Sequence, residues 1–200
     1  MTDEMTSTSL HAIWNGPDIS RSVTEVAFAP SPVEFRELHW YAAYTSANHE
    51  KRVAEQLGVR SIEHFLPLYE SVRRWRDRRM TLQLPLFPGY VFVRMALRDR
   101  LQVLQLPGVA RLVGFNGKPT ALPKEEIEGL RTGLADGLRA QPHPYLTAGR
   151  RAHIRCGPLT GLEGIVLRLK GKWRVVLSLD LIQRAISVEV DASSLEPVIA

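Results

Sequence analysis

The sequence predicts an α+β protein of two domains, an α/β sandwich followed by a small β-barrel. Strand-like and helix-like segments alternate from about residue 38 to residue 139, as in a ferredoxin-like sandwich. Prolines then interrupt the chain at Gln141–Pro144, and only short strand-like segments follow. Several short strands in succession are typical of a closed barrel, which removes exposed sheet edges.

The composition is that of a soluble globular protein. The 200 residues are 44% hydrophobic and 24% charged, which suits one large domain or two small ones. No run approaches the roughly 18 apolar residues that span a bilayer, and the N-terminus lacks the pattern of a secretory signal. A single cysteine, Cys156, excludes an internal disulfide and a thiolate-rich metal site. We therefore expect a cytoplasmic monomer without a membrane partner.

The first domain is expected over residues 37–139. Residues 1–36 sustain neither a helical nor a strand period and contain three prolines, so we expect a disordered tail there. The domain then begins with a strand at Leu38–Tyr44, a helix from its cap at Asn48 through Leu57, and a strand at Ile62–Leu68.

A long hairpin and a proline-framed turn follow. The hairpin tip is expected around Asp77, and its second strand at Met80–Leu84. The nine residues Pro85–Val93 come next, with the sequence PLFPGYVFV. Each proline fixes its own φ and favours an extended residue before it, and the glycine permits a conformation that a Cβ would resist. Phe87 and Tyr90 are thus held at the mouth of a sheet, where they can form core or a docking surface.

The first domain is expected to close with two helices around a strand. The helices are expected at Arg98–Gln105 and Lys124–Arg139, and the strand at Ala110–Phe115 with a turn at Asn116-Gly117. The inward-facing side chains are expected to be Leu97, Leu101 and Leu104 near the first helix and Ile127, Leu130, Leu134 and Leu138 in the second.

The second domain is expected over residues 147–200, after a linker at 140–146. Its sequence predicts five short strands, at Ala152–Arg155, Gly164–Leu169, Trp173–Leu179, Ala185–Val190 and near Leu195. Cys156 is expected as a small buried residue at the end of the first of these strands.

Positive charge is concentrated in the predicted hairpin. The net charge of +5 fits a nucleic-acid partner, although many basic proteins bind none. Five arginines and one tryptophan occupy six of the seven positions 73–79. Guanidinium groups and an indole suit phosphate contacts and base stacking. The alternative is a solvated hairpin whose charge prevents edge pairing.

The order and spacing of these segments resemble the NusG family of transcription elongation factors. In the first domain the resemblance rests on Trp40-Tyr41, on residues 85–93, and on Pro107-Gly108-Val109 leading to Val113-Gly114-Phe115. Residues 148–166 and 184–190 are similar to the KOW module of that family, an SH3-like barrel. The resemblance covers about residues 38–199.

The resemblance implies that the first domain docks on the clamp helices of the largest RNA polymerase subunit and suppresses pausing. Rigid aromatic side chains with exposed faces suit a groove that receives a helix tip. By position, the polymerase-binding residues would be Tyr44, Phe87, Pro88, Tyr90 and Phe115. The aromatic ones could instead be core.

Two further contacts are implied by the resemblance. In specialised RfaH-like members, of which the UpxY and LoaP types are examples, the hairpin contacts the displaced non-template DNA strand; here the residues would be Arg73, Arg74, Trp75, Arg76, Arg78 and Arg79. A loop of the KOW module contacts a small-subunit ribosomal protein or the Rho factor; here it would be Leu181, Ile182, Gln183 and Arg184. Ile182 is aliphatic where housekeeping members commonly carry an aromatic residue, which leaves the Rho contact open.

We expect a binding protein and not an enzyme. The six histidines show no metal-ligand spacing, and no nucleotide-binding glycine pattern is present. No catalytic residue, metal or cofactor is therefore expected. The sequence is interpreted as a specialised paralogue that promotes antitermination of particular operons. Two alternatives stay open, a housekeeping factor that couples polymerase to Rho or the ribosome, and a KOW-type protein that binds RNA or the ribosome.

Overall fold

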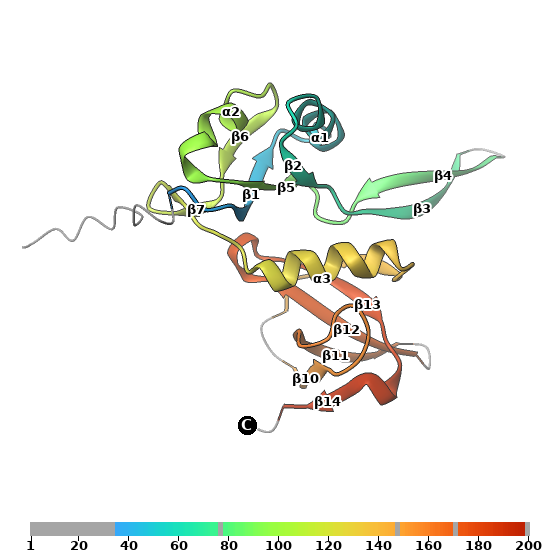
Figure 1. The fold of residues 1–200 in the computed structure, drawn as a ribbon. Helices are drawn as coiled ribbons and strands as arrows, with labels where there is room; N and C mark the ends of the chain where they lie inside the picture. The colour runs from blue at the N-terminus through green and yellow to red at the C-terminus, as the bar shows by residue number, and fades with distance from the viewer. Residues whose placement is uncertain (1–34, 76–77, 147–148, 170–171, 199–200) are drawn as a thin grey trace, which may run out of the picture.

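The computed structural model describes residues 35–75, 78–146, 149–169 and 172–198, and it confirms the predicted α+β class. A four-stranded antiparallel sheet forms the centre of the first domain (Figure 1). Its strands lie in the order β2 (Glu63–Phe65), β5 (Tyr90–Met95), β1 (His39–Thr45) and β6 (Val109–Leu112). Most of the expected tail, residues 1–34, lies outside the described residues.

One face of this sheet is covered by two helices of the same domain. They are α1 (Glu50–Val59) and α2 (Arg100–Leu104), which follows a short 3₁₀ turn, η1 (Leu97–Asp99). Tyr41 of β1 packs in one buried cluster with Val53 of α1 and Val103 of α2. Because side chains alternate along a strand, every second residue of β1 belongs to this face.

The opposite face of the sheet is covered by α3 (Lys124–Ala135). Trp40 of β1 and Phe92 of β5 pack in one buried cluster with Ile127 of this helix. The indole Nε1 of Trp40 also donates a hydrogen bond to Glu128 Oε1, 3.0 Å away. Figure 1 shows α3 lying between this sheet and the second domain.

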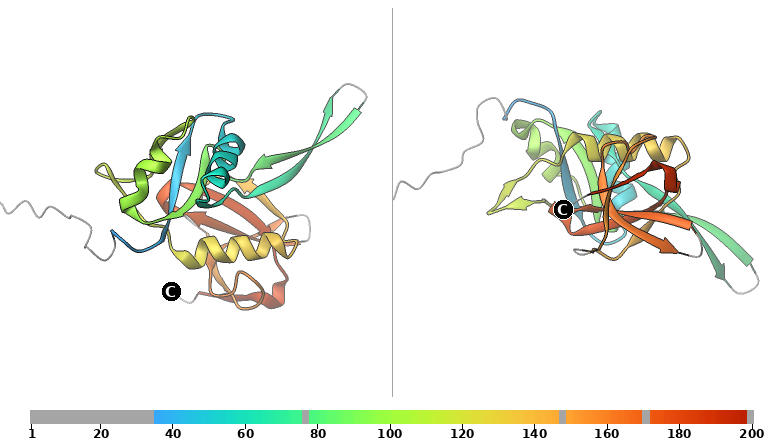
Figure 2. Two further views of the ribbon diagram at one scale, coloured as in Figure 1. Left: turned by 45° about the horizontal axis from the view of Figure 1, so that its top comes forward. Right: turned by 90° about the horizontal axis from the view of Figure 1, so that it is seen from below.

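Two hairpins extend from the first domain. The longer, β3 (Leu68–Trp75) with β4 (Arg78–Pro85), projects from the body of the molecule (Figures 1 and 2). The shorter joins β7 (Gly114–Phe115) to β8 (Lys118–Pro119). Asn116 and Gly117 form its turn at φ of 50° and 74°, so the predicted turn is confirmed.

The second domain is a single antiparallel sheet of six strands, ordered β14-β10-β11-β12-β13-β9. The elements after α3 are β9 (Ala140–His143), β10 (Arg151–Ile154), β11 (Glu163–Leu169), β12 (Lys172–Leu179), η2 (Asp180–Ile182), β13 (Arg184–Glu189), η3 (Ala192–Ser194) and β14 (Leu195–Pro197). The five predicted strands of this domain are confirmed. Cys156 is exposed and not buried as expected, because β10 ends two residues before it.

Several predicted elements differ in detail. Helix α1 begins at Glu50, because Asn48 takes a left-handed φ of 61° and cannot act as the cap. The strand expected at Ile62–Leu68 is two strands, β2 and the start of β3. Likewise, the strand expected at Ala110–Phe115 is divided between β6 and β7.

The predicted inner face near residue 100 is confirmed for Leu97, which is buried, but is wrong for the two other leucines. Leu101 and Leu104 are 57% and 36% exposed, whereas Val103 is fully buried. The turn η1 has the tighter period of a 3₁₀ helix, which shifts the positions that face the sheet.

Helix α3 ends at Ala135, four residues before the predicted end. Gly137 takes a left-handed φ of 86°, and the N–H of Leu138 donates to the carbonyl of Gly133 at 2.8 Å. These are the features of a glycine-terminated helix end. Leu138 still packs against the core, now from the turn after the helix.

The segment expected as a linker contains a paired strand. In β9, Ala140–His143 pair with Val188–Ala185 of β13, including Pro142 opposite Ile186. A proline is compatible with this position because β9 is the outermost strand of the sheet. The connection between the domains is therefore itself part of the second sheet.

Candidate functional site

The proline-framed turn is fixed by hydrogen bonds on both sides. The carbonyl of Phe87 accepts the N–H of Tyr90 at 3.1 Å, and the carbonyl of Gly89 accepts the N–H of Thr45 at 2.8 Å. The N–H of Gly89, at φ 85°, donates to the buried carboxylate of Glu50 at 2.7 Å. Helix α1 and strand β1 thus hold the turn in one conformation.

This rigid turn presents a group of aromatic rings. The rings of Tyr44 and Tyr90 lie 5.4 Å apart, and Phe87 meets Phe92 edge to face at 5.5 Å. The guanidinium of Arg111 lies 5.4 Å from the Tyr44 ring, on the side of β6. The structure therefore brings three of the predicted polymerase-binding residues, Tyr44, Phe87 and Tyr90, to one region.

The five predicted polymerase-binding residues differ widely in exposure. Tyr44 is 37% exposed and Phe115, on the separate β7–β8 hairpin, is 68% exposed, while Pro88 is also exposed. Phe87 and Tyr90 are only 1% and 9% exposed. Tyr44, Pro88 and Phe115 therefore have the exposure of a docking surface, whereas Phe87 and Tyr90 are buried as core residues are.

The second domain supplies much of what buries Phe87 and Tyr90. Phe87 packs in one cluster with Leu177, Leu179 and Ile186 of that domain. The guanidinium of Arg184 lies 5.8 Å from the ring centre of Tyr90. Two groups of residues that the sequence analysis treated separately, the aromatic turn and the loop 181–184, therefore meet at one interface.

The members of that loop are not equally buried. Ile182 is 5% exposed and belongs to the same cluster as Phe87, and Leu181 packs against it. Gln183, at a left-handed φ of 49°, and Arg184 are exposed. The loop thus faces the first domain through its aliphatic residues.

Two glycines in the middle of α3 allow the second domain to approach closely. A β-carbon at Gly129 would lie 3.3 Å from the carbonyl oxygen of Pro158, and one at Gly133 would lie 3.5 Å from the Pro158 ring. Glycine in a helix interior costs about 1 kcal/mol relative to alanine. Both glycines lie on one face of the helix, since they are four residues apart. This pair was not predicted, although two glycines four apart in a helix indicate a close approach.

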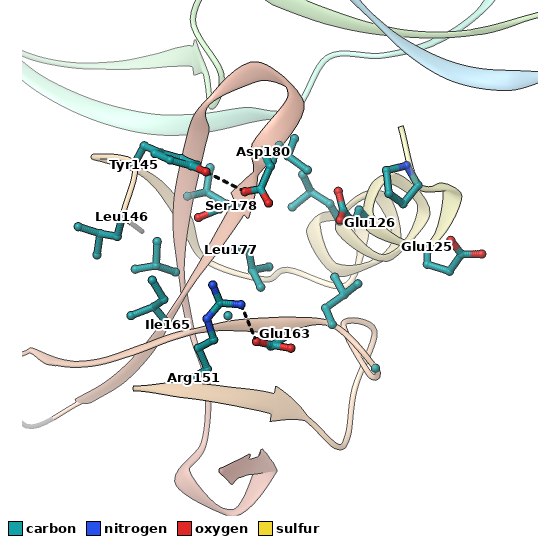
Figure 3. Close-up of a pocket in the computed structure, with 18 of the residues that line it drawn as sticks. Glu125, Glu126, Tyr145, Leu146, Arg151, Glu163, Ile165, Leu177, Ser178 and Asp180 are labelled. Carbon is teal, nitrogen blue, oxygen red and sulfur yellow. Dashed lines mark hydrogen bonds and ion pairs between the residues drawn. The ribbon is translucent and has the colours of Figure 1, made fainter. Parts of the chain in front are cut away.

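A cavity of about 440 Å³ lies between α3 and the second domain (Figure 3). Glu126 points into it from α3, and Asp180 from η2 lies on the opposite wall. Asp180 accepts a hydrogen bond from the hydroxyl of Tyr145 at 3.0 Å, which raises the pKa of that phenol. Arg151 lines the same cavity but is paired with Glu163 at 3.0 Å.

Burial is the main cause that raises the pKa of Glu126 to about 7, with Asp180 and Glu125 adding repulsion. A carboxylate is disfavoured where water is excluded and other negative charges are near. The sequence analysis placed Glu125 and Glu126 only at the beginning of a helix, so this environment was not foreseen. The burial of Glu126 and the nearby charge of Asp180 both depend on the position of the second domain.

The candidate nucleic-acid surface is only partly described. The register pairs Arg73 with Met80, Arg74 with Arg79 and Trp75 with Arg78 on the projecting hairpin, and Arg79 is exposed. Arg76 lies outside the described residues. The two paired strands bring positions 73–75 and 78–79 together, away from the domain interface (Figure 2).

The described part of the chain holds no group of three histidine, cysteine, aspartate or glutamate side chains that could bind a metal ion. Among its helices, none is both long and apolar enough to cross a membrane.

A family model matches most of the first domain, and individual relatives match about four fifths of the whole chain. Residues 38–131 match the family "Transcription termination factor nusG". The chain is 29% identical over 174 residues to the Transcription termination/antitermination protein NusG of Lactococcus lactis, covering 80% of this chain and 92% of the relative. It is 27% identical over 172 residues to the protein of the same description from Escherichia coli K12, covering 78% and 94%.

A solved structure supports the fold. The structure described as "Domain interaction in Thermotoga maritima NusG" matches with a TM-score of 0.51 and 20% identity, over 82% of this chain and 98% of the other.

Proposed function

Taking the NusG-family domain of residues 38–131 as our premise, we propose that this chain binds RNA polymerase at the clamp helices of its largest subunit. There it suppresses pausing and promotes antitermination, as a specialised factor for particular operons. The observation that carries the proposal is the Tyr44–Tyr90 ring pair, mounted beside a turn that Glu50 holds rigid. Rigid aromatic anchors suit a helix tip because little conformational entropy is lost on binding.

The domain interface adds a condition to this binding. Phe87 and Tyr90 are covered, so a helix can reach them only after the second domain moves away. The loop 181–184 is released by the same movement. Polymerase and a partner of the second domain, either a small-subunit ribosomal protein or Rho, would therefore both select the open form.

The projecting hairpin supports a contact with the non-template DNA strand. The backbone of its two strands projects away from the domain interface, and Arg79 is exposed in the closed arrangement. Phosphate contacts would increase affinity without reading sequence. On this proposal, the hairpin fixes the orientation of the first domain on the polymerase.

Binding to a purified clamp-helix fragment of the polymerase tests the docking surface. The exposed residue Tyr44 is changed to alanine, and Val59→Ala, at an apolar residue that is 87% exposed on α1, serves as the control. We expect Tyr44→Ala to weaken binding about tenfold, because an aromatic anchor contributes 1 kcal/mol or more. Unchanged affinity for both Tyr44→Ala and Phe115→Ala would contradict the proposed surface.

A variant designed to separate the two domains tests whether the closed arrangement limits access to Phe87 and Tyr90. Gly129→Arg places a long side chain against Pro158 and should separate the domains, so clamp-helix affinity should rise. Thr132→Arg, at an exposed position of the same helix, is the matched control. Equal affinity for the two variants would show that the second domain does not limit access.

Occupancy of the tagged protein along the genome, beside that of polymerase, tests the specialised role. Signal on a few operons is expected. Uniform signal on all transcribed genes would instead identify a housekeeping factor.

A further inference from the structure

The interface between the domains contains an unfavourable electrostatic interaction between acids of the two domains. Glu126 is half-buried on α3, and Asp180 lies opposite it on η2. The surrounding contacts are otherwise favourable for closure. They include the Gly129 and Gly133 face against Pro158 and the apolar cluster around Phe87. The acid pair is thus the part of the interface that opposes closure.

The charged groups around this pair do not neutralise it. On its own helix, Glu126 has Glu125 as its neighbour in sequence. From the second domain, the cavity is lined by Asp180, Tyr145, Glu163 and Arg151. The one cation in that set, Arg151, is paired with Glu163, and the Tyr145 hydroxyl donates to Asp180.

We propose that Glu126 and Asp180 make closure of the two domains depend on proton concentration, so that the chain opens as the pH rises through neutrality. With Glu126 protonated, the closed form holds one fewer buried negative charge. With Glu126 ionised, a half-buried carboxylate lies in the same cavity as the exposed carboxylate of Asp180. Opening returns Glu126 to water, where its ionised form is well solvated.

The direction and size follow from proton linkage. The pKa of Glu126 is raised to about 7 in the closed form from 4.5, so closure takes up a proton. The contribution to closure is fully present below pH 4.5 and is lost as the pH rises through 7. Between pH 6 and pH 8 these two values give a roughly tenfold fall in the ratio of closed to open molecules.

Fluorescence energy transfer in the full chain tests the proposal. One dye is attached at the native, exposed Cys156 of the second domain and one at Val59→Cys in the first. The populations with high and low transfer are counted from pH 5.5 to pH 8.5. We expect the ratio of closed to open molecules to fall as the pH rises and to level off above about pH 7.

Three variants assign the effect. Glu126→Gln, which resembles the protonated acid, should stay closed throughout and lose the pH dependence. Asp180→Asn removes the opposing charge and so stabilises the closed form with Glu126 ionised; the closed population should be larger above pH 7 and vary less with pH. Glu55→Gln, at an exposed residue of α1 outside the cavity lining, should leave the pH dependence unchanged.

Two results would overturn the proposal. One is the same pH profile for the wild-type chain and Glu126→Gln. The other is a wild-type chain with a single transfer efficiency at every pH. The assay contains no polymerase, so it can fail while clamp-helix binding succeeds, and clamp-helix binding can fail while it succeeds.

Discussion

The two faces of the first domain's sheet are both buried, but different parts of the chain bury them. The face with Tyr41 packs against α1 and α2, which belong to the same domain. The face with Trp40 and Phe92 packs against α3 and, beyond it, against the second domain. Alternation along the strands therefore gives the sheet two different faces. One is closed by α1 and α2 and is here called the permanent core; on the other, here called the shared face, α3 lies between the sheet and the second domain.

The largest expected effect is on the permanent core. Leu57→Ala in α1 removes a fully buried side chain, so the free energy of unfolding of the first domain should fall by about 2–5 kcal/mol. Urea denaturation of the full chain measures this fall. Val59→Ala, two residues away but 87% exposed, should change it little. Equal effects of the two changes would mean that the α1 face is not a distinct core.

The next effect concerns the shared face. Gly129→Arg should lower the ratio of closed to open molecules by tenfold or more, because overpacking costs about 1–3 kcal/mol. The first domain should keep or gain up to about 1 kcal/mol of stability, since arginine is a better helix former than glycine. Energy transfer and urea denaturation measure the two quantities. A fall in both the closed-to-open ratio and the free energy of unfolding of the first domain would show that the shared face cannot be opened without disturbing the permanent core. Thr132→Arg is the control.

A smaller effect is expected at the edge of the shared face. Arg184→Ala removes the guanidinium beside Tyr90, a contact of about 0.5–1 kcal/mol. The closed population should fall about two- to fivefold in the energy-transfer assay. Arg155→Ala, whose arginine pairs with Glu196 within the second domain, should leave closure unchanged.

The smallest expected effect concerns the contact that Glu63 makes between the sheet and α3. Glu63 accepts hydrogen bonds from Arg131 at 2.8 Å and from Arg94 at 3.1 Å, and its pKa is lowered chiefly by the bond from Arg131. Its contribution is present above pH 4.5 and is lost as the pH falls through its lowered pKa. Because all three side chains are substantially exposed, we expect no more than about 1 kcal/mol.

Denaturation at pH 6 and pH 3 measures this contribution. Glu63→Gln should lose less stability than the wild-type chain on acidification. The exposed Glu55→Gln on α1 should behave as the wild type does.

Local chemistry predicted much of the fold. The apolar run after Gly89 is β5, Asn116-Gly117 is a tight turn, and the strands of the second domain lie close to their expected positions. The directions of Leu101 and Leu104 were not predictable from spacing alone, because a 3₁₀ turn precedes their helix. A helical pattern with one fixed period cannot predict which side chains face inward when a 3₁₀ turn comes directly before the helix.

The residues of the candidate site could be named from the sequence, but their spatial arrangement could not be predicted. Phe87 and Tyr90 were identified from the rigid turn, and the loop 181–184 from the resemblance of the second domain to the KOW module. Their contact joins positions that are about one hundred residues apart, and no local rule links them. The signal that was available lay in Gly129 and Gly133, which weaken a helix without forming a turn.

Strand β9 has a consequence for how fast the chain can reclose. It follows α3 after only residues 136–139, and it stays attached to β13 through Ala140–His143. A second domain that swings on four residues remains at an effective concentration in the millimolar range or above. Any partner that selects the open form must therefore compete with a second domain that stays tethered, and the affinity of that partner sets how long the chain stays open.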